Sequence, residues 1–382
     1  MDNYAILSII SLMIVFISSL FAIFLLTVKT KNKTSNRLIA AFLILVAIDI
    51  SSFFYHRFID MPLTLEMIRM DLPSFSSPVL YLFFLSVIYI DFKLKPKHLL
   101  HGLPFVISTL IFTPRFYLAS QEAKLSFMNN YMLTPESIST MIIGHIQVIA
   151  YIIAIFVILK KSKKIMLENY SNATTAKHKW LFQLNVISSF IFVVSTSKTI
   201  FKFYNDDFQT VNIARIIVVF LVLCFICWLI LKALYNPGFF RGIDSKLLPV
   251  ENMITKNETV INLPDDKVIQ DQIQQLKTYM IDQKPYLNPT LTIQNLADDL
   301  QLPVREVSIL INHHLNQHFF DFVNEYRIQH AKDILQNPAK KQFTILEILY
   351  EVGFNSKSSF NTAFKKYANV TPTEYRKKAN HA

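Results

Sequence analysis

Two short segments near the carboxyl terminus place polar side chains at the spacing of one helix face. The first contains Arg305, Ser308, Ile309 and Asn312, and the second contains Lys357, Ser358, Asn361, Thr362 and Lys365. Serine, asparagine and lysine on such a face can hydrogen-bond to the base edges and phosphates of double-stranded DNA. The pattern therefore predicts two helix faces that contact DNA.

The first face lies on the second helix of a predicted helix-turn-helix unit, at about residues 292–315. Thr292 can cap a short helix, and a tight turn follows at Gln301–Leu302. Pro303 suits the first turn of the next helix, where its missing N–H costs nothing. A short helix, a tight turn and a second helix with an exposed polar face are typical of units that insert the second helix into the major groove.

The same pattern recurs at about residues 344–367. Gly353 supplies the turn after a short helix, and Asn355 or Ser356 caps the helix that follows. A longer helix, predicted for Phe319–Leu335, connects the two units as a rigid spacer. Held in this way, the two second helices could enter successive major-groove turns, which lie ~34 Å apart on one face of DNA.

These residues resemble the AraC/XylS-type transcription regulators. The stretch VGFNSKSSFNTAFKKYANVTPTEYRKK (Val352–Lys378) is similar to that family's signature, and Asn324–Ala331 matches its usual connecting helix. The resemblance covers about residues 270–378 and implies an all-helical domain with two helix-turn-helix units. The resemblance also implies base-contacting roles for seven residues, namely Arg305, Ser308, Ile309, Lys357, Ser358, Asn361 and Thr362. Asn312 and Lys365 are assigned from the helix faces alone.

Three positions depart from the family pattern. Leu349 stands where a small alanine is usual, and Asn369 stands where a glycine usually precedes Val-Thr-Pro. Asparagine tolerates the left-handed backbone conformation, so we expect the turn at Asn369 to be kept. Ile309 replaces a residue that is commonly polar, and we expect it to touch a thymine methyl group instead.

The chain as a whole is too apolar for a protein that is soluble throughout. Of its 382 residues, 52% are hydrophobic and 17% are charged, whereas about 25% are charged in typical soluble domains. Its five glycines include no pair spaced for a dinucleotide-binding turn or a phosphate loop. Two cysteines cannot build a disulfide scaffold or a four-thiolate zinc site. Composition therefore excludes these nucleotide enzymes and these Cys-based scaffolds.

Seven apolar segments before residue 235 are candidates for crossing a membrane, and the fourth is short and contains Pro104. They lie at about 4–28, 38–56, 72–92, 99–114, 137–159, 181–204 and 211–234. About 20 apolar residues cross a hydrocarbon core of ~30 Å. Thirteen Lys and Arg residues follow spans one, three and five, against four in the opposite loops. The positive-inside rule then places the amino terminus outside and the carboxyl terminus in the cytoplasm.

The sequence thus predicts an all-α protein with three parts. They are a polytopic helical membrane bundle at 1–234, a linker at 235–266 and a cytoplasmic double helix-turn-helix domain at 267–382. Of the formal charge of +11, residues 1–240 contribute +10 and residues 241–382 only +1. Most of the excess positive charge therefore lies in the membrane region, where it sets the orientation of the bundle. The expected location is the bacterial cytoplasmic (inner) membrane.

The start of the third part, Lys267–Lys284, is a predicted helix with one apolar face, and it allows two interpretations. The face consists of Ile269, Ile273, Leu276 and Met280. It packs on the domain that follows, or it forms a short dimerising seam that relays a state from the membrane. Two heptad turns are too few to establish a coiled coil.

Five ionisable residues lie within the predicted spans, where such residues are costly and often functional. They are Asp49, His145, Lys198, Lys202 and Arg215. The orientation places all but His145 toward the outer half. We hypothesise that they form an outward-facing ligand pocket in which Asp49 opposes a cation. The alternatives are a structural ion pair and snorkelling at the membrane interface.

A membrane-embedded transcription regulator, which senses a signal in or through the membrane and binds promoter DNA, best fits these features. One alternative is a seven-span receptor that signals through a protein partner, and another is a transporter with a regulatory tail. Expected partners are double-stranded promoter DNA, membrane lipid, an unidentified signal ligand, the transcription machinery and a second copy of the chain. No enzyme activity, catalytic residue or cofactor is expected, because the sequence has no phosphate loop, nucleophile elbow or metal-binding cluster. No metal site is expected either, because His313, His314 and His318 lack a completing ligand.

Overall fold

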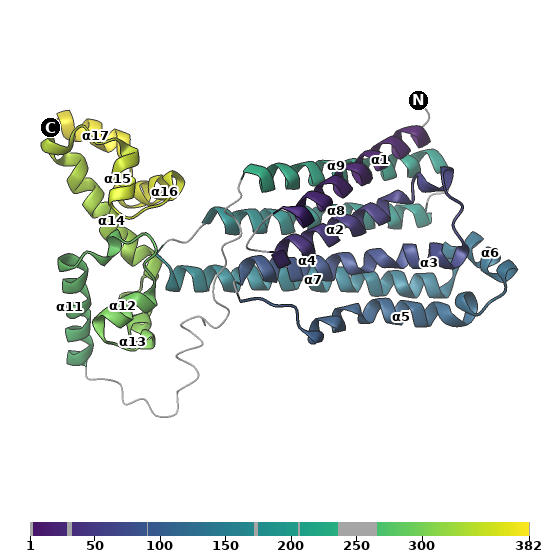
Figure 1. Ribbon diagram of the computed structural model, residues 1–382, viewed down its shortest axis with the longest axis horizontal. Helices are drawn as coiled ribbons and strands as arrows, with labels where there is room; N and C mark the ends of the chain where they lie inside the picture. The colour runs from purple at the N-terminus through teal and green to yellow at the C-terminus, as the bar shows by residue number, and fades with distance from the viewer. Residues whose placement is uncertain are drawn as a thin grey trace. The chain divides into compact units, whose positions relative to one another are not determined.

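The computed structural model of the chain consists of helices joined by turns and short loops (Figure 1). It describes residues 3–28, 33–89, 91–171, 175–204, 207–235 and 266–381, and no β-sheet occurs among them. Unit 1 comprises residues 1–159 and 180–245, and unit 2 comprises residues 160–179 and 246–382. Apart from its first and last residues, the predicted linker at 235–266 lies outside the described residues.

Seven helical segments are long and apolar enough to cross a membrane, which is the number expected from the sequence. They are Asn3–Thr27 (α1), Lys33–Ser51 (α2), Leu63–Ile88 (α3 and α4), Pro96–Tyr117 (containing α5), Pro135–Asn169 (α7), His178–Tyr204 (in α8, Thr175–Tyr204) and Gln209–Ala233 (in α9, Phe208–Tyr235). A short helix, α6 (Gln121–Asn129), precedes α7.

The third and fourth segments are interrupted, which corrects the uninterrupted spans expected at 72–92 and 99–114. The third consists of α3 (Leu63–Asp71), a 3-10 turn at Leu72–Phe75 and α4 (Ser76–Ile88). The fourth begins as a 3-10 helix at Pro96–Gly102, continues as α5 (Leu103–Phe112) and ends in a π-helical turn at Thr113–Tyr117. Proline at positions 73, 96 and 114 supplies no N–H to the helical ladder, which favours these local changes of helix type.

The helix α7 is longer than a membrane span requires. Its 35 residues extend over ~52 Å at ~1.5 Å per residue, against a hydrocarbon core of ~30 Å. The part beyond Leu159 belongs to unit 2, together with the first residues of α8. Both helices therefore extend past the bounds of 159 and 181 expected from hydropathy, because the lysine-rich sequence between them favours helix well enough to continue it.

The helices α1, α2 and α9 pack together around a small apolar cluster. Its buried members are Leu7, Ile14, Ile50 and Val219. Asp49 directly precedes Ile50 on α2, and Arg215 lies one turn before Val219 on α9. This packing therefore brings the charged ends of α2 and α9 to the same end of the bundle.

Most of the helices of unit 2 lie between Asp266 and His381. They are α11 (Asp266–Asp282), α12 (Ile293–Leu300), α13 (Val304–Ile309), α14 (Phe319–Gln336), α15 (Ile345–Glu351), α16 (Lys357–Ala368) and α17 (Pro372–His381). A π-helical turn at Leu310–His314 continues α13. In Figure 1, α14 runs from the group of α11, α12 and α13 to the group of α15, α16 and α17.

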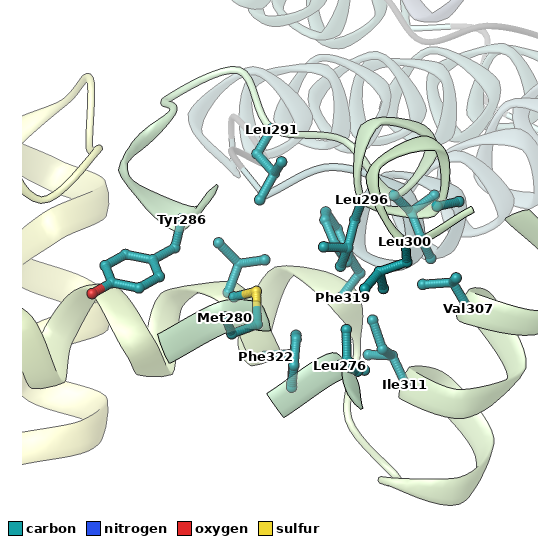
Figure 2. Packing of buried hydrophobic residues seen from close by; sticks show 13 residues of the cluster. Leu276, Met280, Tyr286, Leu291, Leu296, Leu300, Val307, Ile311, Phe319 and Phe322 are labelled. Atoms are coloured by element: carbon teal, nitrogen blue, oxygen red, sulfur yellow. The ribbon is translucent and has the colours of Figure 1, made fainter. Parts of the chain in front are cut away.

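Two apolar cores share α14. The first combines α11, α12 and α13 with the first half of α14, and it buries Leu276, Leu296, Val307, Ile311 and Phe319 among others (Figure 2). The second combines the other half of α14 with α15 and α16, and it buries Ile328, Ile348, Phe360 and Phe364 among others. Because both cores include one helix of 18 residues, the two helix-turn-helix units sit on a rigid spacer ~27 Å long.

The apolar face of α11 packs against its own domain. Ile269 and Ile273 contact Leu310, while Leu276 and Met280 belong to the first core. Each of the four α11 side chains is less than one tenth exposed. The structure therefore favours the packed interpretation of this helix over the dimerising seam.

Gly353 forms the turn between α15 and α16 in a backbone conformation that side chains rarely adopt. Its φ is +88°, and an added Cβ would lie 2.5 Å from the carbonyl oxygen of Tyr286 and 2.8 Å from that of Leu287. We predict that Gly353→Ala destabilises this part of the domain by about 2 kcal/mol or more. Hydrogen exchange on the full chain should then show lower protection of the α15 and α16 amides.

The matched control is Gly144→Ala in α7, where an added Cβ meets no atom within 4 Å. Its helix should keep its protection, because alanine favours helix over glycine. Unchanged protection of α15 and α16 in Gly353→Ala would contradict the described turn.

Candidate functional site

The exposed face of α16 carries all five residues that the sequence assigned to the second recognition helix. Lys357, Ser358, Thr362 and Lys365 are exposed and Asn361 is partly exposed. The opposite face is buried through Phe360, Ala363 and Phe364. Within the described part of the chain, the hydrogen-bonded side chains of α16 and its cap are Ser356, Ser359, Lys366 and Tyr367. The five predicted contact residues are therefore available to a partner.

Both ends of α16 are fixed by local hydrogen bonds. The Ser356 hydroxyl accepts the backbone N–H of Ser359 at 3.1 Å, which selects Ser356 over Asn355 as the cap. At the other end Asn369 has φ +56° and donates its N–H to the carbonyl of Lys365 at 3.0 Å. Asn369 thus keeps the left-handed turn expected from the sequence. Lys357 and Ser358 consequently occupy the first helical turn, where backbone N–H groups attract phosphate.

Lys366 is turned away from this exposed face toward α14. Its ammonium lies 2.6 Å from the Asp321 carboxylate, and the Tyr367 hydroxyl donates to the Asp321 carbonyl at 3.1 Å. Burial, together with the neighbouring carboxylates of Asp321 and Glu325, raises the pKa of Tyr367, so its hydroxyl stays protonated and able to donate. Lys366 and Tyr367 therefore join α16 to the spacer helix.

The first recognition helix presents fewer of the predicted residues. Arg305 and Ile309 are partly exposed on α13. Ser308 is only 1% exposed, which corrects its expected place on the outer face. Its hydroxyl accepts from the Asn312 side chain at 3.3 Å. The physical reason is that α13 has only six residues before the π-helical turn, so a regular 3.6-residue period does not describe its faces.

Asn312 supports the next helix rather than an open surface. Its side-chain oxygen accepts the backbone N–H of Phe319, the first residue of α14, at 3.3 Å, and its amide donates to the Ser308 carbonyl at 3.0 Å. The exposed polar side chains at this end of α13 are His313 and His314. The sequence analysis considered these two only as metal ligands, and the described residues contain no His, Cys, Asp and Glu cluster suited to a metal.

Arg327, in the middle of α14, contacts the loop that precedes the first helix-turn-helix unit and the turn inside the second. Its side chain is fully buried. Nε donates to the Tyr286 carbonyl at 2.7 Å and Nη2 donates to the Asn288 carbonyl at 2.8 Å, both in the loop before α12. The guanidinium carbon also lies 5.5 Å from the ring centre of Phe354, in the turn before α16. The sequence analysis named Arg327 only as part of the connecting-helix motif.

The same guanidinium binds Ser171, which follows α7 and belongs to the same unit. Nη1 donates to the Ser171 carbonyl at 3.1 Å and to the Asn324 side chain at 3.3 Å, and Nη2 donates to the Ser171 hydroxyl at 3.2 Å. The Ser171 hydroxyl in turn donates to the Leu291 carbonyl at 2.7 Å. All five N–H donors of Arg327 are thus used, and every acceptor is neutral.

Burial lowers the pKa of Arg327 to about 10, which leaves the side chain charged at neutral pH. A buried charge without a carboxylate is tolerated only when hydrogen bonds satisfy its donors. We predict that Arg327→Lys, which keeps the charge but loses the planar fork, destabilises the domain by about 2–3 kcal/mol. Hydrogen exchange on the full chain should show α12 and α16 losing protection together. Arg376→Lys on α17 is the control, and equal protection in both variants would refute this role.

Four of the five ionisable residues predicted within the spans line one cavity in unit 1. The cavity has a volume of about 650 Å³, and Asp49, His145, Lys198 and Arg215 are among its lining residues. Lys202, one turn beyond Lys198 on α8, does not line it, which corrects the expected set. The lining otherwise comes mainly from α2, α4, α7, α8 and α9.

The charged residues of this cavity form no ion pair among the described residues. Arg215 donates to the neutral side chain of Asn212 at 2.9 Å, and the His145 ring bonds to the Met141 carbonyl at 2.8 Å. In a nearby ion pair Arg69 lies 2.7 Å from Glu66, and neither residue lines the cavity. Among the described residues, Asp49 thus attracts Lys198 without a direct ion pair.

Comparison with known proteins identifies the carboxyl-terminal region. Residues 296–378 match a family model described as a helix-turn-helix domain. The uncharacterized HTH-type transcriptional regulator YdeC of Bacillus subtilis is 34% identical over 87 residues, which is 23% of this chain and 29% of that protein. The HTH-type transcriptional regulator GlxA of Rhizobium meliloti is 33% identical over 75 residues, which is 20% of this chain and 22% of that protein.

A solved structure, the C-terminal domain of AraT, a response regulator from Geobacillus stearothermophilus, is 27% identical and covers 28% of this chain and 84% of its own, with a TM-score of 0.25. The chain spans less than a third of the length of the curated relatives it matches. The carboxyl-terminal part of the chain is therefore a helix-turn-helix domain of the AraC type, and the proteins similar to it are named as transcriptional regulators.

Proposed function

We propose that the chain is a membrane-embedded transcription regulator that binds promoter DNA through α13 and α16. The observation that carries this proposal is the exposed face of α16, where five polar side chains are free while the opposite face is buried. The helix-turn-helix family match and the names of the similar proteins support it.

In this proposal α16 supplies most of the base contacts. Asn361 can pair with adenine through two hydrogen bonds, Lys357 can donate to guanine, and Ser358 and Thr362 suit either base. Lys365 lies at the end of the same face, where it can neutralise a phosphate. The segment Ser356–Ala382, with six Lys and Arg against one Glu, adds the local positive charge that DNA binding needs.

The first unit contributes a narrower contact. Arg305 can donate two hydrogen bonds to guanine, and Ile309 can pack on a thymine methyl group. Ser308 and Asn312 are excluded from these contacts by their bonds inside the domain. A spacer of ~27 Å between the units is compatible with the ~34 Å between successive major-groove turns.

The seven apolar helical segments support the membrane part of the proposal. Lysine-rich sequence follows α1, α4 and α7, which favours a cytoplasmic location for those ends and for the carboxyl-terminal domain. The regulator would act at the bacterial cytoplasmic membrane, with membrane lipid, an unidentified signal ligand, a second copy of the chain and the transcription machinery as partners.

We predict that the full chain, reconstituted in lipid nanodiscs, selects specific sequences from random duplex DNA with an affinity that falls steeply with salt. Lys357→Ala and Asn361→Ala should each change the preferred base and cost about tenfold in affinity for the original site. Lys366→Ala is the matched control, because it removes a charge from the same helix but from a side chain already bound to Asp321. It should leave the sequence preference unchanged.

If the folded, reconstituted chain prefers no sequence over random DNA, the regulator proposal is wrong. A receptor that signals through a protein partner would then explain the architecture better.

The orientation makes a separate prediction. After replacement of Cys224 and Cys227 by alanine, a cysteine at Glu122 in α6 should react with a membrane-impermeant maleimide on intact cells. A cysteine at Lys163 near the end of α7 should react only after permeabilisation. Both positions are exposed, so their reactivity reports the side of the membrane. The reverse labelling pattern would contradict a cytoplasmic DNA-binding domain.

A further inference from the structure

The cavity of unit 1 changes character along its length. Its charged residues Asp49 and Lys198 lie near the carboxyl ends of α2 and α8, and Arg215 lies near the start of α9. The lining residues farther along α2 and α9 are apolar, namely Phe42 and Val46 of α2 and Val218, Val219, Val222 and Phe225 of α9, whereas α8 adds the polar Asn185, Ser188, Ser195 and Thr196. A ligand that matches this lining has a charged head and an apolar body.

The charges that line the cavity do not cancel. Lys198 and Arg215 are positive and Asp49 is negative, and no other lining residue is an aspartate, glutamate, lysine or arginine. One positive charge therefore remains without a counter-charge in a space enclosed by apolar helices, where an unpaired charge is costly. A ligand with a single negative charge would neutralise it.

The neighbouring cavity does not supply this counter-charge. It has a volume of about 290 Å³ and is lined by Asp71, and it shares Met70, Ser74, Met141, Gly144 and Gln147 with the larger one. Lys198 and Arg215 line only the larger cavity. Asp71 is therefore not placed against the two cations.

The larger cavity also contains polar atoms that lack partners. The Asn185 side-chain oxygen, the Ser188 hydroxyl and the Thr196 hydroxyl are buried and have no hydrogen-bond partner among the described residues. All three residues line the cavity, and Asn185 is only 1% exposed. Buried polar atoms in folded proteins are nearly always hydrogen-bonded. Thr196 lies two residues before Lys198, so a polar head group at the charged end of the cavity can bond to its hydroxyl, whereas Asn185 and Ser188 lie about three turns away on α8.

We propose that this cavity binds a single-chain amphiphile with one carboxylate, such as a fatty acid. The carboxylate lies between Lys198 and Arg215, and the chain extends along the apolar lining residues of α2, α7 and α9. A volume of about 650 Å³ is in the range of sites for ligands of this size, roughly 300–1,000 Å³. The assignment of this ligand as the signal rests on the regulator function proposed above, whereas its binding does not.

The test is equilibrium binding of radiolabelled dodecanoate to the full chain in phosphatidylcholine nanodiscs, against empty nanodiscs. We expect saturable binding that unlabelled dodecanoate displaces and that dodecanol, dodecylammonium and dodecyl betaine do not. Lys198→Met and Arg215→Gln should each weaken binding at least about tenfold, because each removes a charge that faces the carboxylate.

Matched variants separate this effect from damage to the bundle. Lys202→Met removes the same charge one turn farther along α8, outside the lining but near both cations, and should weaken binding less than Lys198→Met does. Asp71→Asn changes the acid of the other cavity and should bind normally. Asp49→Asn should bind as tightly as the wild type or more tightly, since it removes a negative charge from the site. Misfolding cannot produce that gain.

Three results would overturn the proposal. Equal uptake by empty nanodiscs shows partitioning into lipid only. Displacement by the betaine, with loss of binding in Asp49→Asn, assigns the site to a zwitterion instead. Loss of dodecanoate binding in phosphatidylglycerol nanodiscs would show that the anionic headgroup of a bilayer lipid occupies the site instead. No DNA is present in this assay, so its failure leaves the DNA-binding proposal intact, and failure of DNA selection leaves the ligand site intact.

Discussion

The arrangement of the two recognition helices depends on one buried charge, the guanidinium of Arg327. Its five N–H groups bind the loop before α12, the residue Ser171 that follows α7, and Asn324 on its own helix. No carboxylate of the described residues offsets the charge, so the removal of any acceptor leaves a buried donor unsatisfied, at about 1–3 kcal/mol. Three segments that are distant in the sequence are therefore held in one geometry around α14.

The close fit at Gly353 has the same origin. Arg327 draws the loop at residues 285–288 against α14, and Gly353 meets the carbonyl groups of that loop from the side of α16. A side chain at position 353 would push the loop and α16 apart. The glycine and the arginine thus secure one loop from two sides, and this contact joins the unit that contains α13 to the unit that contains α16.

The sequence predicted those features whose causes are local. The cap at Thr292, the turns at Gly353 and Asn369 and the free face of α16 all follow from neighbouring residues, and α16 has twelve residues over which a helical period is regular. The face of α13 could not be predicted, because six residues followed by a π-helical turn do not keep that period. The hydrogen bonds of Arg327 could not be predicted either. Most of its acceptors are backbone carbonyls, which every residue has, so no residue type in the sequence marks them.

For the cavity, too, the sequence predicted which charged residues come together, but the structure was needed to show which of them line it. The cost of placing ions in apolar helices was enough to group Asp49, Lys198 and Arg215, but Lys202 lies one turn farther along the axis of α8 and does not line the cavity. The helices α7 and α8 supply His145 and Lys198 to the cavity, and α7 continues along the chain to Ser171, an acceptor of Arg327. The segment of the chain that supplies His145 to the cavity is thus followed, two residues after α7 ends, by an acceptor of the buried charge on which the helix-turn-helix domain depends.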